Sequence, residues 1–212
     1  DATSFAGEWR ADETAERLIR AGTIEPIIIV AIANAGVRRV DEYTPTVYLG
    51  EGGDGDRYAR FVMTELKPFI DKTYRTLAGR DSTGVCGSSL GGLISLHMAR
   101  TYPDQIGLCA AVSPSLWWSD RQLLHAIEKD PSWTEHCRIW LDMGTAETSP
   151  VRGSQNVENT RQLAAVLERA GRVRGIDFEY LEVADGQHNE AAWAERFPQI
   201  LEFLFGRRKS AR

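Results

Sequence analysis

The chain has 212 residues, a length that predicts one domain of ordinary size. Apolar residues make up 42% and charged residues 26% of the chain, a balance that excludes wholesale disorder. The 25 lysines and arginines are outnumbered by 30 aspartates and glutamates, giving a formal net charge of −5. This charge excludes a nucleic-acid protein that binds through a basic surface.

Apolar runs and cysteines limit the class of protein further. The longest apolar run, residues 27–33, is far shorter than the ~18 residues that a membrane span needs, and no basic, apolar leader opens the chain. Cys86, Cys109 and Cys137 lie in or beside apolar runs without the spacing of metal ligands. We therefore expect three free thiols in the core, no metal, no membrane partner and a cytoplasmic location.

In chain order, the first half of the sequence predicts a helix, a strand and a second helix. The first helix covers residues 8–21 and is stopped by Gly22. The strand at 27–32 is apolar on both faces, as expected for a strand inside a parallel sheet. The helix at 57–74 carries an apolar stripe formed by Phe61, Leu66, Phe69 and Ile70.

The second half alternates more regularly. Strands are predicted at residues 82–87, 107–112, 138–143 and 176–183. Helices are predicted to begin near residue 89 and end near 102, and to cover 119–127, 156–170 and 190–205. The alternation predicts a single α/β domain over residues 1–212, a three-layer sandwich around a mostly parallel central sheet.

A G-x-S-x-G motif, formed by residues 87–91, stands where the strand at 82–87 turns into a helix. The two glycines let strand and helix pack closely around a strained Ser89, whose hydroxyl then points out at the carboxyl end of the sheet. The backbone N–H of Leu90 is placed there to stabilise an oxyanion. Ser89 is the candidate nucleophile, and the alternative is a tight glycine turn with an unreactive serine.

A serine nucleophile needs a base, and four histidines are available. His97 lies eight residues beyond Ser89 on the same helix, about 12 Å away by helical rise. His125 falls inside an amphipathic helix and His136 just before a strand, so both are interpreted as structural. His188 follows the last strand in a polar loop, at the sheet edge where Ser89 is expected. His188 is the candidate base, with an exposed loop histidine as the alternative.

The acid is expected between Ser89 and His188, because α/β-hydrolases place their triad in the order serine, acid, histidine. Glu147 follows the strand at 138–143 in a loop beyond Gly144, and is favoured. Asp142 lies within that strand and Asp185 precedes the histidine, and both stay open as alternatives. The carboxylate would hold the imidazole tautomer and stabilise the imidazolium.

Five stretches in this order carry a resemblance to a known family. They are residues 39–45 (RVDEYTP), 87–92 (GSSLGG), 113–118 (SPSLWW), 144–147 (GTAE) and 188–193 (HNEAAW). The chain resembles the esterase family of α/β-hydrolases that contains enterochelin esterases, esterase D-like enzymes and feruloyl esterase domains. The resemblance implies an α/β-hydrolase fold and a triad of Ser89, Glu147 and His188. It also places Trp117 and Trp118 in the wall of the substrate pocket, with ordinary aromatic packing as the alternative.

One region departs from that family. The second oxyanion donor of this fold comes from the loop between the third strand and the first helix, and the helix at 8–21 resembles that first helix. The early strands and the loop would then precede Asp1, so we expect a chain trimmed at its N-terminus. A substitute donor could come from residues 1–5 or from residues 34–36, which makes Asn34 a candidate binding residue.

The sequence thus predicts a cofactor-free serine ester hydrolase that acts on a small-molecule ester through an acyl-enzyme. Two alternatives stay open: an acyltransferase or thioesterase with the same triad, and a non-catalytic binding protein with the hydrolase fold. A nucleotide site is not expected. The glycine-rich residues 50–55 lack the preceding strand and the following Lys-Ser/Thr of a P-loop, and are interpreted as a surface loop.

Overall fold

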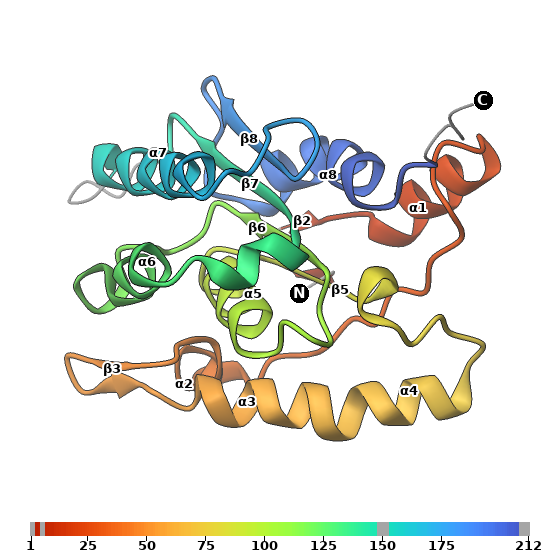
Figure 1. The fold of residues 1–212 in the computed structure, drawn as a ribbon, viewed down its shortest axis with the longest axis horizontal. Coiled ribbons are helices and arrows are strands. Elements are labelled where there is room, and N and C mark those ends of the chain that lie inside the picture. The colour runs from red at the N-terminus through yellow and green to blue at the C-terminus, as the bar shows by residue number, and fades with distance from the viewer. Residues whose placement is uncertain (1–2, 5–6, 148–152, 208–212) are drawn as a thin grey trace. The chain divides into compact units, whose positions relative to one another are not determined.

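A computed structural model describes residues 3–4, 7–147 and 153–207 of the chain (Figure 1). The chain divides into two compact units. The larger unit, Asn34–Gln187, contains the central sheet and the serine motif, and the smaller unit combines Asp1–Ala33 with His188–Arg212. The expectation that residues 1–212 act as a single domain stays a prediction.

The central sheet has four parallel strands in the order β5 (Gly84–Ser88), β6 (Leu108–Val112), β7 (Arg138–Gly144) and β8 (Phe178–Val183). Register is continuous, with Gly87 opposite Ala111 and Ala111 opposite Leu141. All five residues of β6 are buried, which explains why this strand is apolar on both faces. The α/β class with a parallel sheet is therefore confirmed, and the carboxyl ends of all four strands meet at one edge.

Helices pack on this sheet and connect its strands. Helix α5 (Leu90–Thr101) packs on β5 and β6, and its first ten residues are all buried. Helix α7 (Gly153–Arg169) packs on β7 and β8, and α6 (Trp118–Lys129) packs between α5 and α7. Short 3-10 turns at Arg80–Ser82 and Ser132–His136 precede β5 and β7. The core between these elements includes Leu93, Leu96, Ile106, Leu124, Ile127, Ile139, Leu141 and Leu163.

Before the sheet, the larger unit has a helical layer. It comprises a 3-10 turn at Gly36–Arg38, α2 (Arg39–Tyr43), α3 (Gly55–Phe61), a π-helical turn at Val62–Leu66, and α4 (Lys67–Thr73). The helix expected at 57–74 is thus present, but its buried side is not the predicted stripe. Phe61 and Phe69 are exposed, whereas Ala59, Val62 and Met63 are buried. The π-helical turn adds residues to one turn and so changes which positions face inward.

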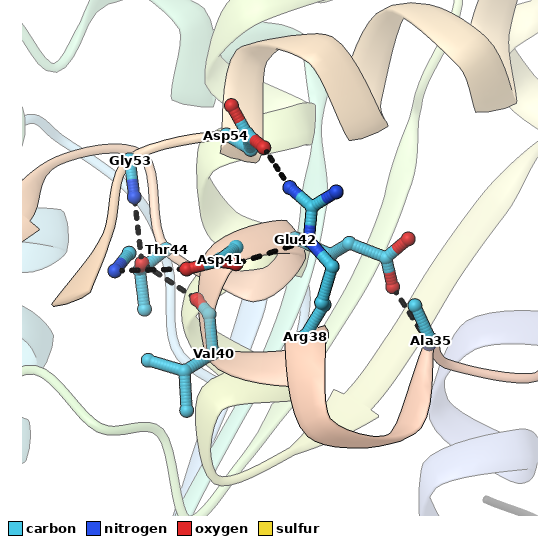
Figure 2. A network of polar contacts seen from close by, with 9 residues as sticks. Ala35, Arg38, Val40, Asp41, Glu42, Thr44, Gly53 and Asp54 are labelled. Atoms are coloured by element: carbon cyan, nitrogen blue, oxygen red, sulfur yellow. Dashed lines mark hydrogen bonds and ion pairs between the residues drawn. The ribbon is translucent and has the colours of Figure 1, made fainter.

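A polar network joins α2 to the glycine-rich segment (Figure 2). The Arg38 guanidinium pairs with Asp41 at 3.2 Å and with Asp54 at 2.8 Å. The Thr44 hydroxyl accepts the Gly53 N–H at 3.2 Å and donates to the Val40 carbonyl at 2.8 Å. Residues 50–55 are therefore not a plain surface loop. They form β4 (Glu51–Gly52), which pairs with β3 (Val47–Tyr48) in a hairpin, and the start of α3.

The smaller unit is built on two helices, α1 (Ala11–Arg20) and α8 (Glu190–Phe205), which pack together. The antiparallel pair β1 (Thr3–Ser4) and β2 (Gly7–Glu8) precedes α1. Trp9 packs against Trp193 and Phe197 of α8, with ring centroids 6.1 Å and 5.4 Å apart. Helix α8 is capped by Asn189, whose side chain accepts the Ala192 N–H at 2.9 Å.

Two expectations on burial are wrong. Residues 27–32 form no strand, and Ile28, Ile29 and Val30 are exposed. An apolar run becomes a strand only where a partner strand offers its backbone groups, and the four-stranded sheet begins at β5 without this segment. Cys109 and Cys137 are buried as expected, but Cys86 is exposed, because it lies on β5 at the end of the strand order.

Within the described ranges, no helix combines the length and apolarity that a membrane crossing requires. Nor do three or more His, Cys, Asp or Glu side chains gather in those ranges as the ligands of a metal ion would.

Candidate active site

Ser89 occupies the sharp turn between β5 and α5 with φ 59° and ψ −122°, a conformation that a residue with a side chain rarely adopts. Neighbouring backbone holds it there. Its N–H donates to the Val112 carbonyl at 2.9 Å, and its carbonyl accepts from Ser115 at 3.0 Å and Leu93 at 3.1 Å. A strained residue fixed by three such bonds is typical of a functional site, and the sequence motif predicted this geometry.

The two glycines of the motif have different roles. A Cβ on Gly87 would lie 2.6 Å from the carbonyl carbon and oxygen of Gly91, so the strand and helix backbones approach too closely for any side chain. A Cβ on Gly91 would meet only the ring of Tyr43, at 4.0 Å. Further along the helix, a Cβ on Gly92 would lie 3.1 Å from Pro114. Close packing at Gly87 and Gly92 thus positions Ser89 between the strand and the turn that follows β6.

Leu90 is the first residue of α5, so its N–H belongs to the group of amides at a helix N-terminus that have no acceptor within the helix. The partial positive charge of a helix N-terminus favours an anion there. Asn34 lies in the larger unit, where its side chain accepts the Gly36 N–H at 2.9 Å. This bond makes Asn34 part of a local turn, and its role in binding stays a prediction.

A turn formed by Ser113, Pro114 and Ser115 follows β6 and contacts both candidate catalytic residues of the larger unit. The Ser115 hydroxyl oxygen lies 3.3 Å from the Ser89 hydroxyl oxygen. The Ser113 hydroxyl donates a short hydrogen bond to Oε1 of Glu147. The structure therefore brings Ser89 and Glu147 to two ends of one three-residue turn.

The two candidate acids on β7 and its loop differ in what they bind. Glu147 is buried and accepts the Gly144 N–H at 2.9 Å, on the same oxygen that accepts from Ser113. Asp142 is fully buried, with Oδ2 accepting the Trp140 indole N–H at 2.6 Å and Oδ1 accepting the Ser113 N–H at 3.1 Å. Asp142 therefore bonds to its own strand through Oδ2 and to the Ser113 turn through Oδ1, and its part as an alternative acid stays a prediction.

The loops after β7 and β8 are hydrogen-bonded to each other. Ala146 donates to the Gly186 carbonyl at 3.1 Å, and Asp185 donates its N–H to the Thr145 hydroxyl at 2.9 Å. The side chain of Asp185, the third candidate acid, is exposed. The loop that holds Glu147 is thus joined to the loop after β8 by bonds to Asp185 and Gly186.

The histidines are placed as follows. His188 belongs to the smaller unit, where its ring packs edge-on against Trp193 with centroids 4.9 Å apart. His97 is buried on α5, with Nε2 2.7 Å from Oδ1 of Asp56, and burial lowers its pKa while Asp56 opposes that shift. His125 contacts Glu128 of its own helix at 3.1 Å, and His136 ends a 3-10 turn. His97 and His125 thus have partners on α3 and on their own helix respectively, and the interpretation of His125 and His136 as structural stays a prediction.

Trp117 is the N-cap of α6 and Trp118 is the first residue of that helix, two and three residues after Ser115. The Trp118 indole N–H donates to the Thr46 carbonyl at 2.8 Å, and its ring packs on Tyr48 of the hairpin at 5.6 Å. Trp118 is buried and so anchors the β3–β4 hairpin, while Trp117 is half-buried beside it at 5.7 Å. Packing accounts for Trp118, and pocket lining by either tryptophan stays a prediction.

Sequence reasoning missed Ser113 and Ser115. A signal for them was present, because both follow the strand at 107–112 directly and so must lie at the carboxyl edge of the sheet. The same argument selected Glu147 and His188 as candidates.

The chain matches the family model described as "Putative esterase" over residues 1–204. The chain belongs to this esterase family. It is 30% identical over 189 residues to the uncharacterized protein YjcH of Bacillus subtilis, and the aligned region covers 87% of this chain and 73% of that protein. It is 29% identical over 179 residues to the iron(III) salmochelin esterase of Escherichia coli, covering 78% of this chain and 40% of that enzyme.

A solved structure agrees with the fold. The crystal structure of an IroE-like serine hydrolase from Shewanella oneidensis superposes with a TM-score of 0.74 and 22% identity, covering 92% of this chain and 66% of that one. The α/β-hydrolase fold is thereby confirmed, and family membership makes the chain an esterase.

Proposed function

We propose that this esterase cleaves small-molecule carboxylic esters through an acyl-enzyme on Ser89, with His188 as base and Glu147 as acid. The strained conformation of Ser89 at the β5–α5 turn is the observation that carries the proposal, because backbone strain held by surrounding bonds concentrates at functional sites. The order of the three residues along the chain and the match of residues 1–204 to the esterase family support it further.

In the proposed reaction, Ser89 Oγ attacks the ester carbonyl carbon while His188 takes the hydroxyl proton. The Leu90 N–H donates to the oxyanion that forms, which is negative charge developing at a helix N-terminus. The intermediate then expels the alcohol, which receives the proton from His188. Water attacks the acyl-enzyme with His188 again as base, and the acid product leaves a free Ser89.

Glu147 is proposed as the acid because of where its oxygens lie. Oε1 is used by the Gly144 N–H and the Ser113 hydroxyl, which fixes the carboxylate in one orientation. Oε2 would then accept from the imidazole. The bonded loops after β7 and β8 support this pairing, because Glu147 follows Ala146 directly and His188 lies two residues beyond Gly186. We also infer that residues 1–212 act as one domain, because one esterase family model matches residues 1–204.

The substrate is proposed by class. The relatives named as salmochelin and enterobactin esterases support a siderophore ester as the first compound to test, and p-nitrophenyl acetate and butyrate report ester cleavage in general. Hydrolysis by the wild-type chain that falls by about 10³-fold or more in Ser89→Ala is the expected result. Equal rates in the two proteins would contradict Ser89 as nucleophile.

A fluorophosphonate probe separates this proposal from its alternatives. Labelling confined to Ser89 is expected of a serine hydrolase, while an unlabelled chain would favour a non-catalytic binding protein. An added alcohol or thiol that diverts most of the acyl group from water would indicate an acyltransferase.

The choice of acid is tested with a matched pair of amides, Glu147→Gln and Asp142→Asn. Each variant replaces one buried carboxylate by its isostere. Glu147→Gln should lower kcat by roughly 10²–10⁴-fold, because the imidazole loses its tautomer control and its countercharge. Asp142→Asn should lower the melting temperature, since one of its two donors loses an acceptor, and keep most of kcat. The reverse ranking would make Asp142 the acid.

A further inference from the structure

Ser115 is a buried serine whose hydroxyl faces the nucleophile. The residue is only 5% exposed, and its Oγ lies 3.3 Å from the Oγ of Ser89. The backbone of the same residue donates to the Ser89 carbonyl at 3.0 Å. Ser115 therefore contacts Ser89 twice, once through its backbone and once through its side chain.

The turn that carries Ser115 is rigid. Pro114 fixes one backbone angle, and its carbonyl accepts from Leu116 at 2.8 Å. The Ser115 carbonyl accepts the Trp118 N–H at 3.1 Å, and Ser113 is bound through its N–H to Asp142 of β7. Helix α5 packs on this turn at Gly92, where a side chain would lie 3.1 Å from Pro114. The hydroxyl of Ser115 is thus presented at a fixed place, because none of these backbone bonds depends on it.

We propose that Ser115 is a positioning residue for the nucleophile: its hydroxyl donates to Ser89 Oγ in the resting enzyme. This inference rests on the proposed function of Ser89. A donated hydrogen bond occupies one lone pair of Ser89 Oγ and selects one side-chain rotamer. The hydroxyl proton of Ser89 then remains for the base, and the second lone pair remains for the ester carbonyl.

The size of the effect follows from the kind of bond. The two hydroxyls are neutral and 3.3 Å apart, so the bond is at the long end of its range. Loss of the Ser115 hydroxyl should lower kcat about tenfold, which is ~1.4 kcal/mol at 1.36 kcal/mol per factor of ten. KM should change less than about twofold, because the bond orients the nucleophile and contributes no binding to the ester.

The test compares Ser115→Ala with a matched control, Ser95→Ala. Ser95 is also a buried serine, lies on α5, and donates its hydroxyl to the Gly91 carbonyl of that helix at 2.8 Å. Both variants remove one buried hydroxyl. Three quantities are measured on the full chain: kcat and KM with p-nitrophenyl butyrate, the rate constant of fluorophosphonate labelling, and the melting temperature.

Ser115→Ala should lower kcat and the labelling rate by the same factor of about ten, while Ser95→Ala stays near wild type in both. Ser115→Thr, which keeps the hydroxyl, should recover most of the labelling rate. The inference is overturned if Ser115→Ala labels as fast as Ser95→Ala, or if a Ser115→Thr protein with wild-type melting temperature labels as slowly as Ser115→Ala.

The two proposals fail in different ways. If Ser89→Ala retains ester hydrolysis, or if the probe labels another residue, the proposed function fails and the role of Ser115 falls with it. If Ser89→Ala is inactive and unlabelled while Ser115→Ala matches wild type, only the role of Ser115 is wrong. The labelling rate reads the reactivity of Ser89 even with an ester that the enzyme turns over slowly.

Discussion

Gly87 is the residue at which one added methyl group should do the most damage to the candidate site. A Cβ there would lie 2.6 Å from two backbone atoms of Gly91 and 2.9 Å from a third. Nonpolar contacts are optimal at about 3.5–4.0 Å, so strand β5 and helix α5 would have to separate by about 1 Å. Neither can yield by rotating a side chain, because all three contacting atoms of Gly91 belong to the backbone.

The cost of Gly87→Ala can be estimated from this overlap. Overpacking a core lowers the unfolding free energy by typically about 1–3 kcal/mol. Because the added methyl group of Gly87→Ala would meet only backbone atoms, we expect a loss of about 3 kcal/mol. A chain of this size loses roughly 2–4 °C of melting temperature per kcal/mol, so the melting temperature should fall by about 6–12 °C. Displacement of Ser89 by about 1 Å should also lower kcat/KM by about 10²-fold.

Gly91→Ala is the matched control, since it adds the same methyl group to the same motif. Its Cβ would meet only the Tyr43 ring at 4.0 Å, and alanine is favoured over glycine inside a helix by about 1 kcal/mol. Thermal unfolding followed by circular dichroism should therefore show an unchanged or higher melting temperature for Gly91→Ala. Equal melting temperatures for the two variants would refute the steric argument, as would a larger loss in Gly91→Ala.

Two further predictions concern buried polar groups. Ser113→Ala removes a hydrogen-bond donor from the buried carboxylate of Glu147, so the unfolding free energy measured in urea should fall by about 2 kcal/mol. A decrease below about 0.5 kcal/mol would contradict a stabilising bond between the two residues. Burial lowers the pKa of His97 below 6.5 in the folded chain, so the unfolded chain binds the proton more readily. The contribution of His97 to the unfolding free energy is therefore present above pH 6.5 and is lost as the pH falls through the folded-state pKa. Between pH 7.5 and 5.5, the unfolding free energy of His97→Gln should fall by less than that of the wild type. An identical pH dependence in the two proteins would count against the burial argument.

Local patterns in the sequence were enough to predict the class of fold and the place of the candidate nucleophile. The strands β5 to β8 are short apolar runs between helical patterns, and each was expected within two residues of its observed bounds. The G-x-S-x-G motif predicted the strained turn at Ser89, because glycine spacing is a local constraint on the backbone. Candidate acids could be ordered along the chain by the rule that functional loops follow the carboxyl ends of strands.

Only the tertiary structure decided which surfaces are covered and which polar groups meet. Residues 27–32 have the composition of a buried strand, yet a strand requires backbone partners, and these depend on the rest of the sheet. The same holds for Phe61 and Phe69, which face solvent because a π-helical turn shifts the side of the helix that packs inward. Likewise, the hydrogen bonds of Glu147 to Gly144 and to the Ser113 hydroxyl, and those of Asp142 to Trp140 and to the Ser113 N–H, could not be read from the sequence. Periodicity and motifs are properties of neighbouring residues, whereas strand partners, burial and hydrogen bonds between loops are set by segments far apart in the sequence.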